Sequence, residues 1–248
     1  MHKPGLSIVI PVYNSEKTLR LLVEQLEKTL VGFEPFEILL INDSSTDSSY
    51  KIIKQLSDDY KEVTGISLDA NYGQQSAILC GLRHAALDYA VIMDDDLEHN
   101  PMDIPKLFYE IKNGYDVVYA LNSQKTYSGM FRAVGSKLRD ITFNILTDKP
   151  KESKVCSFRI LNRETVDNVI KADKVFVYIS MEILKHTNNI SNIYVDYGSR
   201  RESGHSMGKL VKLLFSIYVY YSKSRLLRGF VKSGPAYRIG ETTGKAAK

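Results

Sequence analysis

An acidic cluster ends an apolar stretch in the segment YAVIMDDDLEHNP, which holds Asp94, Asp95 and Asp96. Carboxylates at the mouth of a buried strand are stable only when they are solvated, paired or bound to a cation. Asp94 and Asp96 alternate along an extended segment, Glu98 continues the spacing, and carboxylate oxygens are the ligands that Mg²⁺ and Mn²⁺ take in proteins. We therefore predict a divalent metal, Mg²⁺ or Mn²⁺, at Asp94, Asp96 and Glu98. An acidic turn that binds no ligand is the alternative.

The elements that must position this cluster are strands and helices in alternation. Stretches with apolar residues at helical spacing separate short β-branched runs, which lie at 6–12, 36–42, 64–68, 90–93 and 116–121. Such alternation predicts an α/β fold with right-handed crossovers and a mostly parallel central sheet. Ligands of these sheets bind beyond the carboxyl ends of the strands. Polar segments follow the first four runs there, at Pro11–Glu16, Asp43–Asp47, Asn71–Gln75 and Asp94–Glu98.

The second half of the chain has a looser pattern. We expect a helix over Ser128–Leu146, a basic turn at Asp148–Lys154, a strand over Val155–Leu161 and a last helix from Lys209 to about Val231. The predicted organisation is one domain over residues 1–207, with halves at 1–121 and 122–207. An amphipathic helix at 208–231 follows, and then a flexible tail at 232–248 that includes the sequence GETTGKAAK.

The composition fits one domain with an appended helix. Of 248 residues, 44% are hydrophobic and 25% charged, which is close to ordinary globular usage. Cys80 and Cys156 have neither disulfide nor zinc-site spacing, and no export signal is recognisable, so we expect a cytoplasmic protein. The formal net charge is +4, with basic residues gathered after Arg200. That charge favours an anionic membrane surface or phosphates over nucleic acid, for which no motif is present.

Sequence blocks in a fixed order carry a resemblance to a known family. They read IVIPVYNSEKTL, EILLINDSSTDSS, NYGQQSAILCGLRHA and AVIMDDDLEHNP, with weaker echoes in FRAVGSKL, CSFRILNRETVD and RRESGHSMGKLVKL. The chain resembles the family 2 glycosyltransferases over most of residues 6–220, specifically the dolichol-phosphate mannose synthase and bacterial polyprenyl-phosphate glycosyltransferase group. The resemblance implies the GT-A fold and a nucleotide-diphosphate sugar as donor, bound by the half at 1–121. It leaves the acceptor to the half at 122–207.

The resemblance also implies which residues bind the donor. Tyr13 would stack on the base or ribose, and Asp43 would read the base edge, whereas Asp47 is better explained as a helix cap. Ser15 stands where relatives often have Glu, and Asp95 where they often have a small residue. The predicted donor set is Pro11, Tyr13, Asp43, Asn71, Gln74, Asp94 and Asp95, and Asp96 is the catalytic member of the acidic cluster.

Basic residues would stabilise the departing diphosphate and the acceptor. Arg132 matches a phosphate-binding arginine of the polyprenyl-phosphate group, and Lys125 would stand in for a second arginine usually found near Ser123. Arg201 and Ser206 belong to a loop with glycine and serine that would close over the donor phosphates. We predict Arg132 and Arg201 as catalytic residues, and Lys125, Arg132 and Ser206 as ligands of the acceptor or its phosphate.

The class of acceptor is predicted from the absence of a paired carboxylate that could act as general base. Transfer to a sugar hydroxyl needs a carboxylate base, which enzymes of this fold generally supply from a Glu-Asp pair. The second half has no such pair, and Glu182, the nearest single candidate, is on a helix where a solvated position is equally reasonable. A polyprenyl phosphate is already an anion, so we predict an inverting transfer to it. The alternative is addition of a sugar to a lipid-linked saccharide in surface polysaccharide assembly. A nucleotidyltransferase would need a glycine-rich first loop, which PVYNSEKTL lacks, and a non-catalytic nucleotide-binding module would not depend on Asp94 and Asp96.

The last predicted helix bears on the partners. Its segment LLFSIYVYYS lies between Lys212 and Lys223 and is rich in tyrosine, which favours a helix at the headgroup level of a membrane. It is too short to span, because crossing takes about 20 apolar residues. We expect peripheral attachment to the cytoplasmic membrane face. A core helix with a dimer face, and hence a homo-oligomer, is the alternative.

Overall fold

The central feature of the fold is an eight-stranded sheet in the order β7-β5-β6-β4-β1-β2-β3-β8. The computed structural model describes residues 4–33, 35–123, 141–147, 150, 152–198, 207–222 and 234–244. The strands are β1 Leu6–Val12, β2 Phe36–Asn42, β3 Val63–Leu68, β4 Tyr89–Ile92, β5 Val117–Asn122, β6 Arg159–Asn162, β7 Ile190–Val195 and β8 Ile239–Thr242. β6 runs antiparallel to β4 and β5, and β8 antiparallel to β3. The other pairings are parallel, which confirms the expected α/β fold with a mostly parallel sheet.

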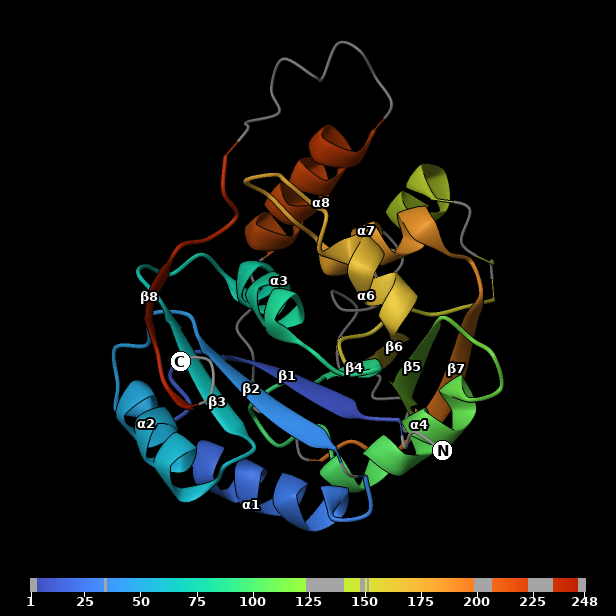
Figure 1. Ribbon diagram of the computed structural model, residues 1–248. Coiled ribbons are helices and arrows are strands. Elements are labelled where there is room, and N and C mark those ends of the chain that lie inside the picture. The colour runs from blue at the N-terminus through green and yellow to red at the C-terminus, as the bar shows by residue number, and fades with distance from the viewer. Residues whose placement is uncertain are drawn as a thin grey trace.

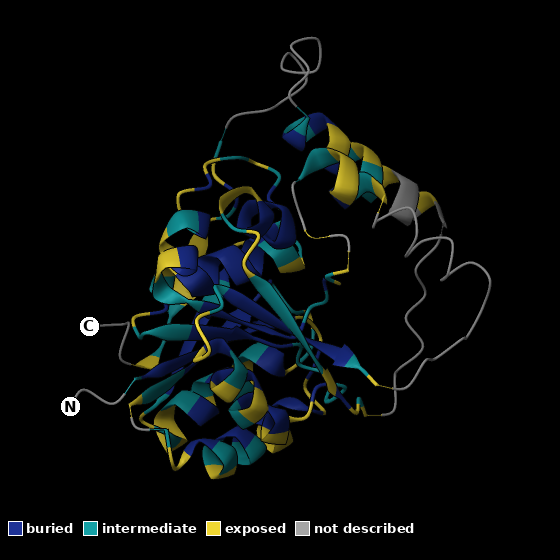
Figure 2. Ribbon diagram, turned by 90° about the vertical axis from the view of Figure 1, so that its right-hand side faces the viewer, coloured by how far each residue is buried: buried dark blue, intermediate teal, exposed yellow. Residues whose placement is uncertain are grey.

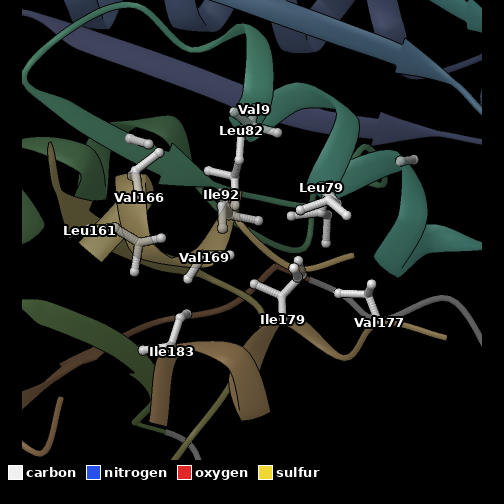
Figure 3. Close-up of a cluster of buried hydrophobic side chains, with 14 of the residues drawn as sticks. Val9, Leu79, Leu82, Ile92, Leu161, Val166, Val169, Val177, Ile179 and Ile183 are labelled. Atoms are coloured by element: carbon white, nitrogen blue, oxygen red, sulfur yellow. The ribbon is translucent and has the colours of Figure 1, made fainter. Parts of the chain in front are cut away.

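Helices cover both faces of this sheet (Figure 1). One face packs against α1 Leu19–Leu30, α2 Ser49–Asp59 and α4 Ile104–Ile111, with the short 3₁₀ helix η1 Pro101–Asp103 before α4. The other face packs against α3 Gln74–His84, α6 Arg163–Val169 and α7 Ile179–His186, and α8 Met207–Tyr221 joins the same core. Residues 141–146 form a further short helix. Two apolar cores therefore sandwich the sheet, and Figure 3 shows the one beneath α3, α6 and α7.

The strand positions follow from burial on both faces. Every residue of β1 is buried, because a central parallel strand covered by helices needs apolar side chains in both directions. The predicted runs at 6–12 and 36–42 coincide with β1 and β2, and the other three match β3, β4 and β5 to within one residue. The strand expected at Val155–Leu161 is shorter, and β6 begins only at Arg159. The carboxyl ends of β1 to β4 meet at one edge, where the polar segments were predicted to gather.

The C-terminal segment differs from its prediction. The tail at 232–248 was expected to be flexible, but Ile239–Thr242 forms β8 and pairs with the edge of β3. Asp69 N–H donates to the carbonyl of Arg238 at 3.1 Å, Thr243 N–H donates to the carbonyl of Gly65 at 2.7 Å, and Ala236 is buried. The edge of β3 has unpaired backbone groups that favour a further strand, and low apolar content in the tail hid this role.

The last helix is present, but its predicted amphipathic character is not confirmed. α8 runs from Met207 to Tyr221, and residues 223–231 of the predicted helix lie outside the described part of the chain. It buries Ile217 and Tyr221 yet exposes Phe215 and Tyr218. Apolar side chains therefore occupy both the packed and the exposed side, and Figure 2 shows α8 at the periphery, on the side toward which β5 runs.

A chain that ends at residue 233 should be less stable than the full chain. Removing 234–248 exposes the edge of β3 and loses the hydrogen bonds to Asp69 and Gly65, each worth about 1 kcal/mol net. We expect the free energy of unfolding to fall by roughly 2 kcal/mol or more, and the midpoint of thermal unfolding by about 4–8 °C. Differential scanning calorimetry measures both.

The matched control is Glu241→Gln, which removes the exposed ion pair with Lys54 and keeps the length of the side chain. Such pairs are worth about 0.5 kcal/mol, so this variant should unfold within about 2 °C of the parent. Equal midpoints for the truncated and full chains would show that β8 contributes nothing to stability.

Candidate active site

The loops after β1 and β2 are held together by Asn14. Its side-chain oxygen accepts the backbone N–H of Thr46 at 2.9 Å, and its own N–H donates to the hydroxyl of Ser45 at 3.1 Å. Asn14, Ser44 and Leu97 have φ values of 54°, 56° and 65°, and they are the non-glycine residues with positive φ in the described part of the chain. All three lie in loops at the carboxyl edge of the sheet, after β1, β2 and β4. Strained backbone of this kind concentrates at functional sites.

Asp95 links the loop after β4 to the loop after β1. Its Oδ2 accepts the hydroxyl of Ser15 at 2.5 Å and the backbone N–H of Tyr13 at 3.2 Å. Burial raises the pKa of the Asp95 carboxyl to about 6 although these hydrogen bonds oppose the rise, and the charges of Asp94 and Asp96 add to it. Asp95, predicted to bind the donor directly, is therefore turned toward the protein and holds Tyr13 in place.

Asp43 and Gln74 bring the third loop to the same edge. Asp43 is 3% exposed and accepts the N–H groups of Tyr72 at 2.7 Å and Gly73 at 2.8 Å, one on each oxygen. Gly73 has a φ of 87°, which an L side chain rarely adopts, so glycine is needed at this start of α3. At the first position of α3, Gln74 donates from Nε2 to Oδ1 of Asp94 at 2.6 Å. Asp43 and Gln74 thus both reach the loops predicted to bind the donor.

The acidic loop itself is closed by short-range contacts. Oδ1 of Asp96 accepts the N–H of Glu98 at 3.0 Å, and the carbonyl of Glu98 accepts the N–H of Gly198 at 2.8 Å. A Cβ on Gly198 would lie 2.8 Å from the carbonyl oxygen of Leu97, so only glycine allows this approach. The loop after β7 therefore packs directly on the acidic loop.

The oxygen atoms that the acidic loop could offer as metal ligands provide only part of the coordination shell of a divalent cation. Within the described residues, no three His, Cys, Asp or Glu side chains are gathered as a ready-made metal cage. Asp94 and Asp96 nevertheless supply carboxylate oxygens beside an edge of the sheet, and Mg²⁺ is commonly held by one or two carboxylates with substrate phosphates completing its shell. The chemistry of the donor set suits a metal that arrives with a diphosphate, and the joint ligation by Asp94, Asp96 and Glu98 stays a prediction.

The remaining residues that were predicted to bind the nucleotide-sugar donor differ in how far they are exposed. The Tyr13 side chain is 50% exposed, so it is free to stack on a ligand and does not pack in the core. Asn71 is also exposed, whereas Pro11 is buried at the end of β1.

Glu16 and Asp47 cap each other's loops, because Glu16 accepts the N–H of Ser48 and Asp47 accepts that of Glu16. Asp47 also accepts the N–H of Ser49 at the start of α2, which confirms its capping role.

Glu182 is not the solvated side chain that one reading of the sequence allowed. It is 4% exposed, forms ion pairs with Lys174 and Lys185, and accepts the hydroxyl of Tyr221 at 2.7 Å. Burial alone would raise the pKa of Glu182, but the hydrogen bond from Tyr221 and the two lysine charges hold it below its ordinary value. A carboxylate so fully paired is a poor general base.

The predicted phosphate ligands cannot be located. Lys125, Arg132, Arg201 and Ser206 lie outside the described residues, which leave out 124–140 and 199–206. Their roles stay predictions.

Sequence reasoning missed two residues that shape the acidic loop. Ser15 binds Asp95, and His99 accepts the N–H of Asp94 on Nδ1 at 3.0 Å while only 1% exposed. The sequence did hold a signal for Ser15. The loop after β1 has this small hydroxyl where relatives often have Glu, and the loop after β4 has the extra carboxylate of Asp95 where they often have a small residue. Nothing in the spacing of His99 marks it as buried against Asp94.

Comparison with known proteins identifies the family of this chain. Residues 7–173 match the family described as Glycosyl transferase family 2. An undecaprenyl-phosphate 4-deoxy-4-formamido-L-arabinose transferase of Pectobacterium atrosepticum is 32% identical over 220 residues, which cover 86% of this chain and 65% of that protein. The protein of the same name from Yersinia enterocolitica is 28% identical over 215 residues, covering 85% and 65%. The chain thus spans 65% of the length of these relatives.

Solved structures share the fold at low sequence identity. Glucosyl-3-phosphoglycerate synthase of Mycobacterium tuberculosis, in complex with Mn²⁺, UDP-glucose and phosphoglyceric acid, has a TM-score of 0.67 at 13% identity, covering 97% of this chain and 89% of that one. TarS of S. aureus with UDP-GlcNAc has a TM-score of 0.61 at 16% identity, covering 89% and 68%.

The chain belongs to glycosyl transferase family 2, because the family match covers more than half of its residues. Its architecture is the GT-A-like α/β fold that the sequence blocks predicted.

Asp95→Asn should change how the stability of the metal-free protein depends on pH. A carboxyl whose pKa rises from 3.8 to about 6 on folding binds more protons folded than unfolded between these values. The free energy of unfolding therefore falls as pH rises from 4 to 6, by on the order of 2 kcal/mol. An amide keeps both hydrogen bonds on one oxygen and carries no charge. The variant should be the more stable protein at pH 7.5 and equal to the parent at pH 4, as denaturant titration in a chelating buffer would measure.

Asp59→Asn is the control for this comparison. Asp59 is an exposed carboxylate paired with Arg20, so its replacement should leave the pH profile within roughly 0.5 kcal/mol of the parent. A stability difference between Asp95→Asn and the parent that stays constant from pH 4 to 7.5 would contradict the assignment of the titration to Asp95.

Proposed function

We propose that this chain is an inverting, metal-dependent glycosyltransferase that moves a sugar from a nucleotide-diphosphate sugar to a polyprenyl phosphate. The observation that carries the proposal is the meeting of the exposed Tyr13 ring, Gln74 and the acidic loop at one edge of the sheet. A nucleotide bound there would have an aromatic surface for its base and carboxylates for a metal that binds its diphosphate. The nucleotide sugars bound to the solved neighbours support the donor class.

The bound Mg²⁺ or Mn²⁺ would supply positive charge to the departing diphosphate. Asp96 and Asp94 would hold it, and Glu98 is a further candidate ligand. Arg201 is a candidate for added positive charge, because it belongs to the loop that was predicted to close over the donor phosphates. Arg132, Lys125 and Ser206 are the proposed ligands of the acceptor phosphate.

An acceptor that is already an anion suits this site. An oxygen of the lipid phosphate attacks the anomeric carbon, the bond from that carbon to the diphosphate breaks, and the nucleoside diphosphate leaves with the bonding electrons. No proton has to be removed, which agrees with the full pairing of Glu182 by Lys174, Lys185 and Tyr221. The curated relatives are named for undecaprenyl phosphate, which supports this class of acceptor.

A lipid-linked saccharide is the second candidate acceptor, and Asp196 is the observation that favours it. Asp196 follows β7, is exposed, and accepts the hydroxyl of Ser123 at the end of β5. A carboxylate at that edge could remove a proton from a sugar hydroxyl.

Asp96→Ala should abolish transfer and Mn²⁺-dependent nucleotide binding together. Loss of a metal ligand removes several kcal/mol of transition-state stabilisation, so turnover should drop by about 10³-fold or more. A thermal-shift screen of uridine, guanosine and thymidine diphosphates with Mg²⁺ or Mn²⁺ identifies the nucleotide. A ligand at 100 times its Kd stabilises by about 2.7 kcal/mol, and Asp96→Ala should lose that gain. Full turnover in this variant would refute the proposal.

Asp196→Asn tests the choice between the two acceptors. Transfer to polyprenyl phosphate needs no base, so this variant should keep its turnover within about threefold. A loss of about 10²-fold or more would identify a general base and favour the saccharide acceptor. Product analysis with polyprenyl phosphate against a lipid-linked sugar completes the comparison.

We also propose that α8 attaches the chain to the cytoplasmic face of a membrane. No helix in the described ranges is long and apolar enough to cross a bilayer. The exposed side of α8 carries Phe215, which is 66% exposed, and Tyr218, which is 47% exposed, and Lys212 is exposed beside them. Ile141 and Ile145 are exposed on the short helix at 141–146. Aromatic rings with nearby lysine are typical of helices that lie at the headgroup level.

Replacing Phe215 and Tyr218 by Ser should weaken binding to vesicles that contain anionic lipid. Each aromatic ring that leaves the membrane costs about 1–2 kcal/mol, so losing both should lower the partition coefficient by roughly 30- to 1,000-fold in a co-sedimentation assay. Tyr109→Ser is the control, because Tyr109 is 68% exposed on α4, which covers the opposite face of the sheet. Equal sedimentation of the parent and the Phe215 and Tyr218 variant would exclude α8 as the membrane contact.

A further inference from the structure

The pairing between β4 and β6 stops just before the acidic loop. The last paired residues are Ile92 of β4 and Arg159 of β6. Beyond them, Met93 N–H still donates to the carbonyl of Val9 on the β1 side, at 3.3 Å. The next N–H, that of Asp94, points to the opposite side, because successive amides of a strand alternate in direction. On that side the ladder has already ended.

The imidazole of His99 occupies this end of the ladder. Its Nδ1 accepts the N–H of Asp94 at 3.0 Å, and its Nε2 lies 3.4 Å from the hydroxyl of Ser157, which precedes β6. The ring thus lies between the residues that would have continued the pairing. The positive φ of Leu97 and the turn closed by Asp96 and Glu98 return the chain so that His99 reaches Asp94.

Aromatic packing fixes the plane of this ring. It stacks on Phe158 with centroids 4.9 Å apart at 18°, and meets Tyr197 edge-on at 4.9 Å and 79°. The Tyr197 hydroxyl is itself held by the carbonyl of Ala120 at 2.8 Å. A ring clamped on two sides and only 1% exposed keeps its nitrogens in fixed directions.

The nitrogens in turn fix Asp94. Because Nδ1 accepts a hydrogen bond, the neutral ring carries its proton on Nε2, which lies 3.8 Å from Oδ2 of Asp94. His99 therefore contacts the same residue at its backbone and faces its carboxylate, while Gln74 binds the other carboxylate oxygen. The direction of the Asp94 carboxylate depends on both contacts.

We propose that His99 is a positioning residue for Asp94: its Nδ1 replaces the missing strand partner and sets where the Asp94 carboxylate points. The inference rests on the proposed metal-dependent transfer. His99 would touch neither donor nor acceptor and would act only through Asp94. Groups that orient metal ligands in this way typically contribute 10- to 100-fold to metal affinity or activity.

Three substitutions separate the hydrogen bond from the packing. His99→Phe keeps a stacked ring and removes the acceptor. His99→Asn and His99→Leu both lose the ring and have similar size, but only Asn offers an oxygen near the place of Nδ1. We expect the Phe and Leu variants to need 10- to 100-fold more Mn²⁺ for half-saturation of nucleoside diphosphate binding, and the Asn variant to stay within about threefold of the parent.

The measurement uses the full chain, Mn²⁺ and whichever of uridine, guanosine or thymidine diphosphate stabilises the parent most. The unfolding midpoint in a chelating buffer reports what each substitution does to folding without the metal, so it distinguishes a general loss of stability from a loss of metal binding. A Phe variant with the parent's Mn²⁺ requirement, or an Asn variant as impaired as Leu, would overturn the role of His99. A parent chain that binds no nucleoside diphosphate in a Mn²⁺-dependent way would instead overturn the proposed function, and this inference with it.

Discussion

The hydrogen bonds that Asp95 accepts from Ser15 and Tyr13 join the loops after β1 and β4, and the geometry of the site depends on them. A parallel sheet brings the carboxyl ends of its strands to one edge but does not fix the loops beyond them. These loops are fixed here by the buried carboxylate of Asp95, which lies between Asp94 and Asp96 in the sequence. Burial raises the pKa of Asp95 to about 6. The contact between the two loops therefore costs folding free energy in the metal-free protein. A bound cation would lower that cost by offsetting the clustered negative charge.

The end of the chain is connected to the same site through the sheet edge. The carbonyl of Arg238, just before β8, accepts the N–H of Asp69, and Asp69 accepts the hydroxyl of Tyr72 at 2.8 Å. Tyr72 in turn donates its backbone N–H to Asp43. A hydrogen-bonded path therefore runs from the C-terminal segment to the carboxylate predicted to read the base. β8 covers an exposed edge and also supports the loop that begins α3.

The sequence predicted what depends on local pattern and on strand order. The runs at 6–12 and 36–42 are strands because continuous apolar stretches suit a sheet covered on both faces, and Asp47 caps α2 because a short acid before a helix satisfies free N–H groups. The acidic cluster was found from the contrast between three charges and the apolar strand before them.

What could not be predicted depends on tertiary contacts. The direction of the Asp95 side chain is set by Ser15, which lies 80 residues away. β8 forms because the edge of β3 is available, although Ile239–Thr242 has little strand pattern of its own. The helical position of Glu182 was equally compatible with a solvated and a buried carboxylate, and only the lysines and Tyr221 around it decide between them.

Those contacts of Glu182 also tie the predicted acceptor side to the last helix. Tyr221, at the end of α8, donates its hydroxyl to Glu182 and accepts the N–H of Tyr178 at 2.9 Å, while Lys174 and Lys185 lie over its ring at 4.4 Å. Breaking such a buried charge cluster costs several kcal/mol, so α8 is held rigidly on α7. If the aromatic side of α8 lies on a membrane, this rigidity fixes the orientation of the whole sheet toward the lipid headgroups. The buried carboxylate of Glu182 would then have two effects. It would be unavailable for proton transfer, and it would align the site with an acceptor from which no proton has to be removed.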